Sequence, residues 1–75
     1  MIDSTSAGMR CRAVREIRTC QGLIRRFAEG VIQFDMENLG RRLVRVKWDS
    51  GIVDYAYPIE IEILEANGVA AANRL

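Results

Sequence analysis

The side chains in this chain that could do chemistry are few. There are two cysteines, Cys11 and Cys20, two carboxylates two residues apart, Glu60 and Glu62, and no histidine. Without histidine the usual general base near neutral pH is missing, and the common zinc ligand sets are out of reach. The cysteines have no C-x-x-C spacing, and Cys11 falls in phase with a strand face, which favours a buried structural thiol. We therefore expect no catalytic, cofactor-binding or metal-ligating residue, and we do not expect an enzyme.

Basic side chains are the candidates for contact with a partner. Ten of the eleven basic residues are arginine, whose planar fork of donors suits carboxylates and phosphates. Strand alternation puts Arg45 and Lys47 on one outward face, and Arg10 and Arg12 also share a face. The residues expected to contact a partner are Arg10, Arg12, Arg41, Arg42, Arg45, Lys47 and Trp48. An ordinary charged solvent face has the same pattern, so this prediction depends on how the strands bring these residues together.

Few aromatic residues are present. Phe34 and Trp48 alternate in phase with aliphatic residues, so both are expected in the core. Trp48 also stands at the end of its strand beside a hairpin, which leaves a second interpretation, a half-exposed anchor for a partner. An aromatic cage would need Phe27, Tyr55 and Tyr57 to converge, and we do not expect one.

Length and charge limit the class of protein. A chain of 75 residues has room for one hydrophobic core. Residues 1–48 carry ten basic and five acidic residues, a net charge of +5, and residues 49–75 carry one basic and five acidic, a net charge of −4. No apolar run approaches the roughly 20 residues that span a bilayer, and no signal peptide is visible. We expect a cytoplasmic protein with free thiols and no membrane partner.

The pattern of alternation and turns predicts a single all-β domain over residues 9–65, between a flexible lead at 1–8 and a flexible tail at 66–75. Strands are expected at 9–14, 31–36, 42–48 and 52–57, with a final short strand after a turn at Pro58. Residues 37–40 read as a turn in which Asn38 and Gly40 take positive φ, and residues 49–51 as a tight hairpin closed by Gly51. The stretch 15–30 is expected to be a long loop, with a helix over 13–26 as the alternative.

This order of elements resembles the five-stranded SH3-like barrel, in which a long first loop, a short turn and a tight hairpin precede one helical turn and a last strand. The segment Pro58-Ile59-Glu60-Ile61 looks like that helical turn. Gly30-Val31-Ile32 is similar to the opening of the second strand in small bacterial SH3-like and KOW-type barrels, and Val46-Lys47-Trp48-Asp49-Ser50-Gly51 resembles the hairpin of Mib/Herc2-type barrels. The first loop lacks the aromatic residues of peptide-binding SH3 domains, so the binding of proline-rich ligands is not expected.

These observations favour a small non-catalytic protein-interaction module, an accessory or regulatory subunit that docks to a larger protein, with an acidic protein as one candidate. The alternative is a KOW-like barrel that binds nucleic acid through its arginine-rich face. A third hypothesis rests on fold analogy alone and has the arginine face dock an acidic electron carrier or enzyme. The oligomeric state does not follow from the sequence.

Overall fold

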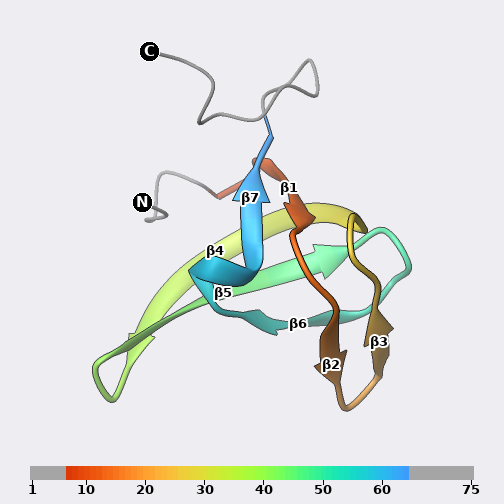
Figure 1. Cartoon of the computed structure of the whole chain (residues 1–75). Helices are drawn as coiled ribbons and strands as arrows, with labels where there is room; N and C mark the ends of the chain where they lie inside the picture. Colours follow the sequence, from red (N-terminus) through yellow and green to blue (C-terminus); the bar gives the residue numbers. More distant parts are fainter. Residues whose placement is uncertain (1–6, 65–75) are drawn as a thin grey trace.

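The computed structural model describes residues 7–64, which are all-β and contain seven strands and one short 3-10 turn (Figure 1). Apart from Ala7 and Gly8, the expected lead at 1–8 and tail at 66–75 lie outside the described residues. The elements are β1 (Arg10–Ala13), β2 (Ile17–Thr19), β3 (Gly22–Ile24), β4 (Glu29–Asn38), β5 (Arg41–Trp48), β6 (Val53–Ala56), η2 (Pro58–Glu60) and β7 (Ile61–Ile63).

Five of the strands form one antiparallel sheet in the order β6-β5-β4-β1-β7. The long strand β4 pairs with β1 through its first residues and with β5 over nearly its whole length, so it joins the two ends of the sheet. In Figure 1 the β4–β5 hairpin curves across the molecule and β7 crosses in front of it. The expected strands are therefore present, and the expected turn at Pro58 is the 3-10 turn η2.

The stretch 15–30 differs from the expected long loop, and the alternative of a helix over 13–26 is wrong. It contains the two-stranded sheet β2–β3, closed by a turn in which Thr19 Oγ1 donates to the carbonyl of Gly22 at 2.6 Å. Ile17 and Ile24 are register partners in this hairpin, and both are buried. The hairpin forms because its two isoleucines reach the common core, a tertiary contact that overrides weak local preference.

Two tight turns set the lengths of the central strands. Between β4 and β5, Leu39 has φ of 53° and Gly40 has φ of 80°, whereas Asn38 is the last residue of its strand. The expected positive φ is thus confirmed at Gly40 but falls on Leu39 in place of Asn38. Between β5 and β6, Gly51 has φ of 99° and its N–H donates to the carbonyl of Trp48 at 2.8 Å. A turn closed by glycine in this conformation is a common three-residue hairpin.

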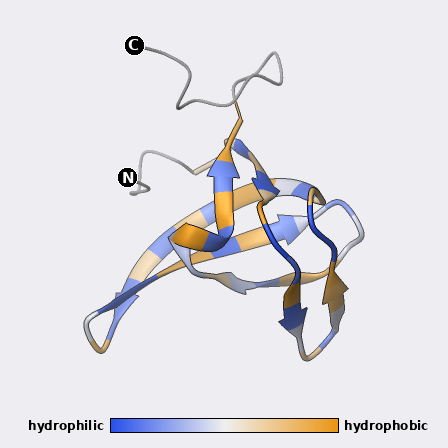
Figure 2. Cartoon of the chain, in the orientation of Figure 1, coloured by the Kyte–Doolittle hydropathy of each residue, from blue (hydrophilic) through white to orange (hydrophobic). Residues whose placement is uncertain are grey.

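The core lies on the inner face of the sheet, under the β2–β3 hairpin. Its members are fully or almost fully buried hydrophobic residues: Cys11, Ala13, Ile17, Ile24, Ile32, Val44, Val46, Trp48, Ala56 and Ile61. Figure 2 shows the alternation of hydrophobic and hydrophilic residues along the strands that produces this inner face. Gly30 is the register partner of Trp48, and a Cβ at Gly30 would lie 2.7 Å from the Lys47 carbonyl oxygen. Strands β4 and β5 therefore approach each other at a point where only glycine fits.

A β-bulge in β4 changes which side chains face outward. Ile32 pairs with Val46 and Phe34 pairs with Arg45, so the register shifts by one residue at Gln33. A bulge of this kind reverses the alternation of every residue that follows it. Phe34 therefore lies on the outward face and is 43% exposed. The expectation that Phe34 belongs to the core is wrong for this reason.

Candidate functional site

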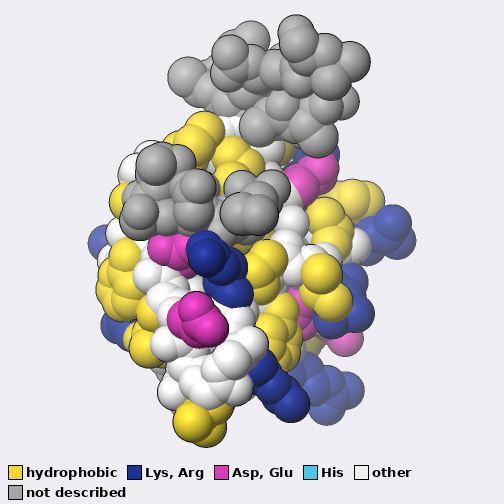
Figure 3. Space-filling view, turned by 90° about the vertical axis from the view of Figure 1, so that its left-hand side faces the viewer, with side chains coloured by type: hydrophobic (Ala, Val, Ile, Leu, Met, Phe, Trp, Pro, Cys, Tyr) yellow, Lys and Arg dark blue, Asp and Glu magenta, His cyan; other side chains and the backbone are white. Residues whose placement is uncertain are grey.

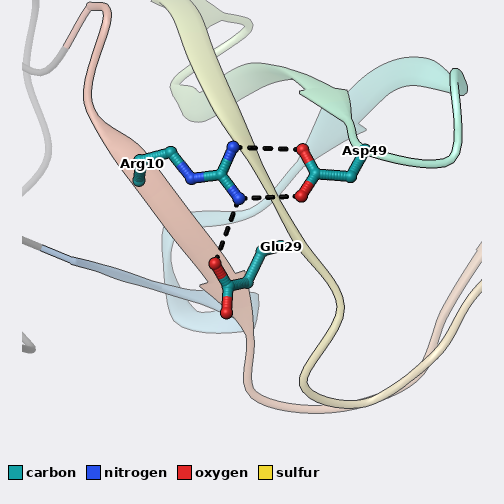
Figure 4. A network of polar contacts seen from close by, with 3 residues as sticks. All are labelled: Arg10, Glu29 and Asp49. Atoms are coloured by element: carbon teal, nitrogen blue, oxygen red, sulfur yellow. Dashed lines mark hydrogen bonds and ion pairs between the residues drawn. The ribbon is translucent and has the colours of Figure 1, made fainter. Parts of the chain in front are cut away.

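Arg10, one of the predicted contact residues, forms ion pairs with two carboxylates (Figure 4). Its Nη1 and Nη2 atoms donate to the two carboxylate oxygens of Asp49 at 3.1 and 2.7 Å, and Nη2 also donates to Glu29 at 3.0 Å. The hydrogen bonds that Arg10 donates to Asp49 and to Glu29 raise the pKa of Arg10, and the bond that Asp49 accepts from Arg10 lowers the pKa of Asp49. Because two carboxylates surround one guanidinium, this part of the surface does not present a free positive charge.

Three other arginines are paired in the same way. Arg12 Nε donates to Glu62 at 2.8 Å, and Arg15 forms an ion pair with Glu60. Arg42 forms an ion pair with Asp35, whose side chain is only 6% exposed, on the inner side of the β4–β5 hairpin. The pairs of Arg10 with Asp49, Arg12 with Glu62 and Arg15 with Glu60 join the basic first part of the chain to the acidic last part. The charge asymmetry of the sequence is therefore partly neutralised in the fold.

Trp48 is not part of an exposed site. It is 2% exposed, ends β5 opposite Gly30 and belongs to the core cluster. The expectation that Trp48 is a core residue is confirmed, and the interpretation of it as a half-exposed partner anchor is wrong. Its position in strand phase with Val44 and Val46 explains the burial.

The remaining predicted residues, Arg41, Arg45 and Lys47, lie together on the outward face of the sheet. We define the outer patch as the outward side chains of β4 from Val31 onward, of β5 and of β6, together with Tyr57. Its members are Val31, Phe34, Met36, Asn38, Arg41, Leu43, Arg45, Lys47, Val53, Tyr55 and Tyr57. Among the described residues, Arg41, Arg45 and Lys47 form no ion pair, and the outer patch contains no acidic side chain.

The cations of the outer patch all come from β5, whereas most of its apolar side chains come from the neighbouring strands β4 and β6. The central strand β5 carries Arg41, Leu43, Arg45 and Lys47, and the register places Phe34 and Tyr55 on either side of Arg45. The ring centroids of Phe34 and Tyr55 are 6.4 Å apart in an edge-to-face arrangement. Met36 is 38% exposed and is the register partner of Leu43. Apolar side chains thus flank the basic column, as expected of a binding surface with an apolar part and an anion-binding part.

Two neighbours hold Arg45 in place. Its Nε donates to Gln33 Oε1 at 3.0 Å, and its guanidinium carbon lies 5.4 Å from the centroid of the Tyr55 ring. Gln33 is the extra residue of the β-bulge. Within residues 7–64 the two Nη groups of Arg45 make no hydrogen bond, so its fork of donors is oriented and unoccupied.

A shallow hollow of about 300 Å³ adjoins the outer patch where β6 meets β2 and η2. Leu43, Tyr55 and Tyr57 line one side of it, and Ile17, Glu16, Arg18, Ala56 and Glu60 complete it. Arg41 Nη1 donates to the Tyr57 hydroxyl at 3.3 Å on the same side. The space-filling view confirms that hydrophobic side chains reach the surface at several places among charged ones (Figure 3).

Among the described residues, the thiols of the two cysteines and the carboxylates of Glu60 and Glu62 do not gather into one cluster. Cys11 is buried, and burial raises the pKa of its thiol to about 12, whereas Cys20 is exposed. Glu60 and Glu62 belong to different elements and pair with different arginines, Arg15 and Arg12. Within the part of the chain that the structure describes, no three His, Cys, Asp or Glu side chains gather as metal ligands do. In the same range no helix has the length and hydrophobicity to cross a membrane.

Sequence reasoning missed the apolar half of the outer patch. Phe34 and Met36 follow the strand alternation of Ile32 in the sequence, so nothing in the pattern marks the bulge that turns them outward. The sequence marks Tyr55 as a candidate for an aromatic cage with Phe27 and Tyr57, which is not expected to form. Its contacts with Phe34 and Arg45 depend on pairing across three strands, which local patterns do not determine.

The chain matches no family model, no curated protein and no solved structure, so its function has to be inferred from its own surface.

Proposed function

We propose that this chain is a small non-catalytic protein-interaction module, an accessory or regulatory subunit that docks to a larger partner through the outer patch. The proposal rests on one observation: some of the basic residues form ion pairs with acidic side chains, and others do not. Arg10, Arg12 and Arg42 are paired with acidic side chains, whereas among the described residues Arg41, Arg45 and Lys47 form no ion pair and lie beside exposed apolar side chains.

We also propose that the five-stranded sheet is a form of the SH3-like barrel. The strand order β6-β5-β4-β1-β7, the 3-10 turn before the last strand and the tight hairpin between β5 and β6 support this assignment. In such folds function is carried by local surfaces, so the assignment by itself names no partner.

Site-specific photo-crosslinking in cells tests the docking surface. We would replace Phe34 by p-benzoylphenylalanine and, as a control, replace Leu23 in β3, because these side chains are 43% and 46% exposed. We expect a discrete crosslinked product from position 34, no such product from position 23, and loss of the product on adding Arg45→Glu. Equal crosslinking from both positions, or a product insensitive to Arg45→Glu in a folded variant, would show that the outer patch is not the docking surface.

One observation favours nucleic acid as a second candidate partner. The ring of Phe34 is exposed beside Arg45, and bases stack on exposed aromatic rings while arginines hold the phosphates. If the three cations of the patch contact phosphates, log K for single strands should fall with log salt with a slope of about −2. Titration with single- and double-stranded RNA and DNA tests this, and absence of binding at roughly 50 mM salt excludes it.

A further inference from the structure

The spacing of charges on the outer patch restricts what its partner can be, and this inference rests on the proposed function. Same-face neighbours on a strand are about 7 Å apart, so Arg45 and Lys47 are separated by that distance along β5 and Arg41 by about twice as much from Arg45. Leu43 occupies the intervening position, with Met36 beside it. A complementary surface therefore needs negative charges separated by one apolar group.

The contacts of the Arg45 side chain indicate which kind of anionic group it can bind. Gln33 and Tyr55 fix the plane of its guanidinium, and within the described residues its two Nη groups make no hydrogen bond. The same chain shows what such a fork binds, because Arg10 holds the two oxygens of Asp49 with its two Nη atoms. A planar fork with both Nη groups unoccupied matches a carboxylate in two-point contact.

The apolar side chains of the outer patch favour a protein segment over a nucleic acid strand as the partner. Met36 and Leu43 are aliphatic and flexible, which suits contact with aliphatic or aromatic side chains and gives no flat surface for a base. One aromatic ring, that of Tyr55, already lies under the Arg45 guanidinium.

We propose that the partner binds through an acidic segment in which an apolar side chain stands between acidic ones. A carboxylate of the segment sits on the Nη groups of Arg45, and the apolar side chain packs on Leu43 and Met36. Further acidic side chains face Arg41 and Lys47. Gln33 is a positioning residue in this arrangement, because it orients Arg45 without touching the segment.

Selection from a library of random displayed peptides tests this proposal on the intact chain. We expect the enriched peptides to be acidic with at least one large apolar residue, and to shift amide resonances of β4, β5 and β6. Arg45→Lys keeps the charge but loses the fork, so it should weaken these peptides about tenfold, the equivalent of 1.4 kcal/mol. Arg25→Lys, at an exposed arginine that directly follows β3, should leave binding unchanged.

The outcomes separate the two proposals. Enriched peptides that are neutral or basic but still require Phe34 overturn the acidic segment and leave the docking surface intact. Peptides that bind Phe34→Ala and Arg45→Glu variants as well as the parent overturn the docking surface itself. Failure to enrich any peptide, or an Arg45→Lys variant that binds as tightly as the parent, also overturns the acidic segment. Tighter binding of a single-stranded oligonucleotide at the same resonances assigns the patch to nucleic acid.

Discussion

Replacement of Trp48 by alanine should remove most of the stability of this domain. The side chain is 2% exposed and is the largest of the fully buried residues. It closes the core at the end of β5, and its partner in β4 is Gly30, which has no side chain to fill the space that Trp48 would leave. Gly30 therefore cannot fill the cavity that the Trp48→Ala substitution would leave.

The expected magnitude follows from burial and size. Emptying a large aromatic core site costs about 3–5 kcal/mol. At the stability per residue that is typical of globular proteins, the domain formed by residues 7–64 has a free energy of unfolding of about 3–9 kcal/mol. The Trp48→Ala variant should therefore lose at least about a third of its free energy of unfolding at 25 °C, and it should be largely unfolded if the stability of the parent lies in the lower half of that range.

Urea denaturation followed by far-ultraviolet circular dichroism is the suitable assay. Trp48 is the single tryptophan of the chain, so its fluorescence cannot report on the variant. Trp48→Phe is the matched control, because it keeps a ring in the site and should cost roughly half as much. It should also keep partner binding, because Trp48 is not part of the outer patch. A Trp48→Ala variant within about 1 kcal/mol of the parent would refute this account of the core.

The remaining predictions concern two turn or strand positions and the two cysteines. Gly30→Ala should lower the free energy of unfolding by about 1–3 kcal/mol, measured in the same urea assay, because its Cβ meets backbone atoms of β5. Leu39→Asn should raise the free energy of unfolding by about 0.5–1 kcal/mol, and with it the melting temperature, because asparagine tolerates the positive φ that leucine resists. Cys20 should react with a thiol reagent at pH 8 while Cys11 reacts only on unfolding. Since the pKa of folded Cys11 is raised from 9.0 to about 12, the unfolded state loses the proton first, and stability should fall as pH rises from 9 to 12. Cys11→Ala should flatten that dependence.

The parts of the fold that depend on local pattern followed from the sequence. The alternation of Val44, Val46 and Trp48 predicted one buried face of β5, and the structure buries all three. Gly51 closes its hairpin with the positive φ that its turn demands. These features depend on the pleat and on turn chemistry within a few residues, which is the range over which sequence patterns carry information.

The parts that depend on distant contacts did not follow from the sequence. The β2–β3 hairpin forms because Ile17 and Ile24 reach a core built by other strands. The sequence predicts Arg10 as a contact residue, but its carboxylate partners lie 19 and 39 residues further along the chain. A basic residue is available to a partner only when the fold brings no acidic side chain to it, and strand pairing decides this.

The bulge at Gln33 shows how one residue determines the candidate site. Without it, uninterrupted alternation would direct Asp35 outward, beside the basic column of β5, and would turn Phe34 and Met36 inward. With it, Asp35 faces inward and pairs with Arg42, while the two apolar side chains join the outer patch. The extra residue itself accepts the Nε hydrogen bond of Arg45. The same irregularity therefore removes a negative charge from the patch, supplies its apolar side chains and orients its central arginine.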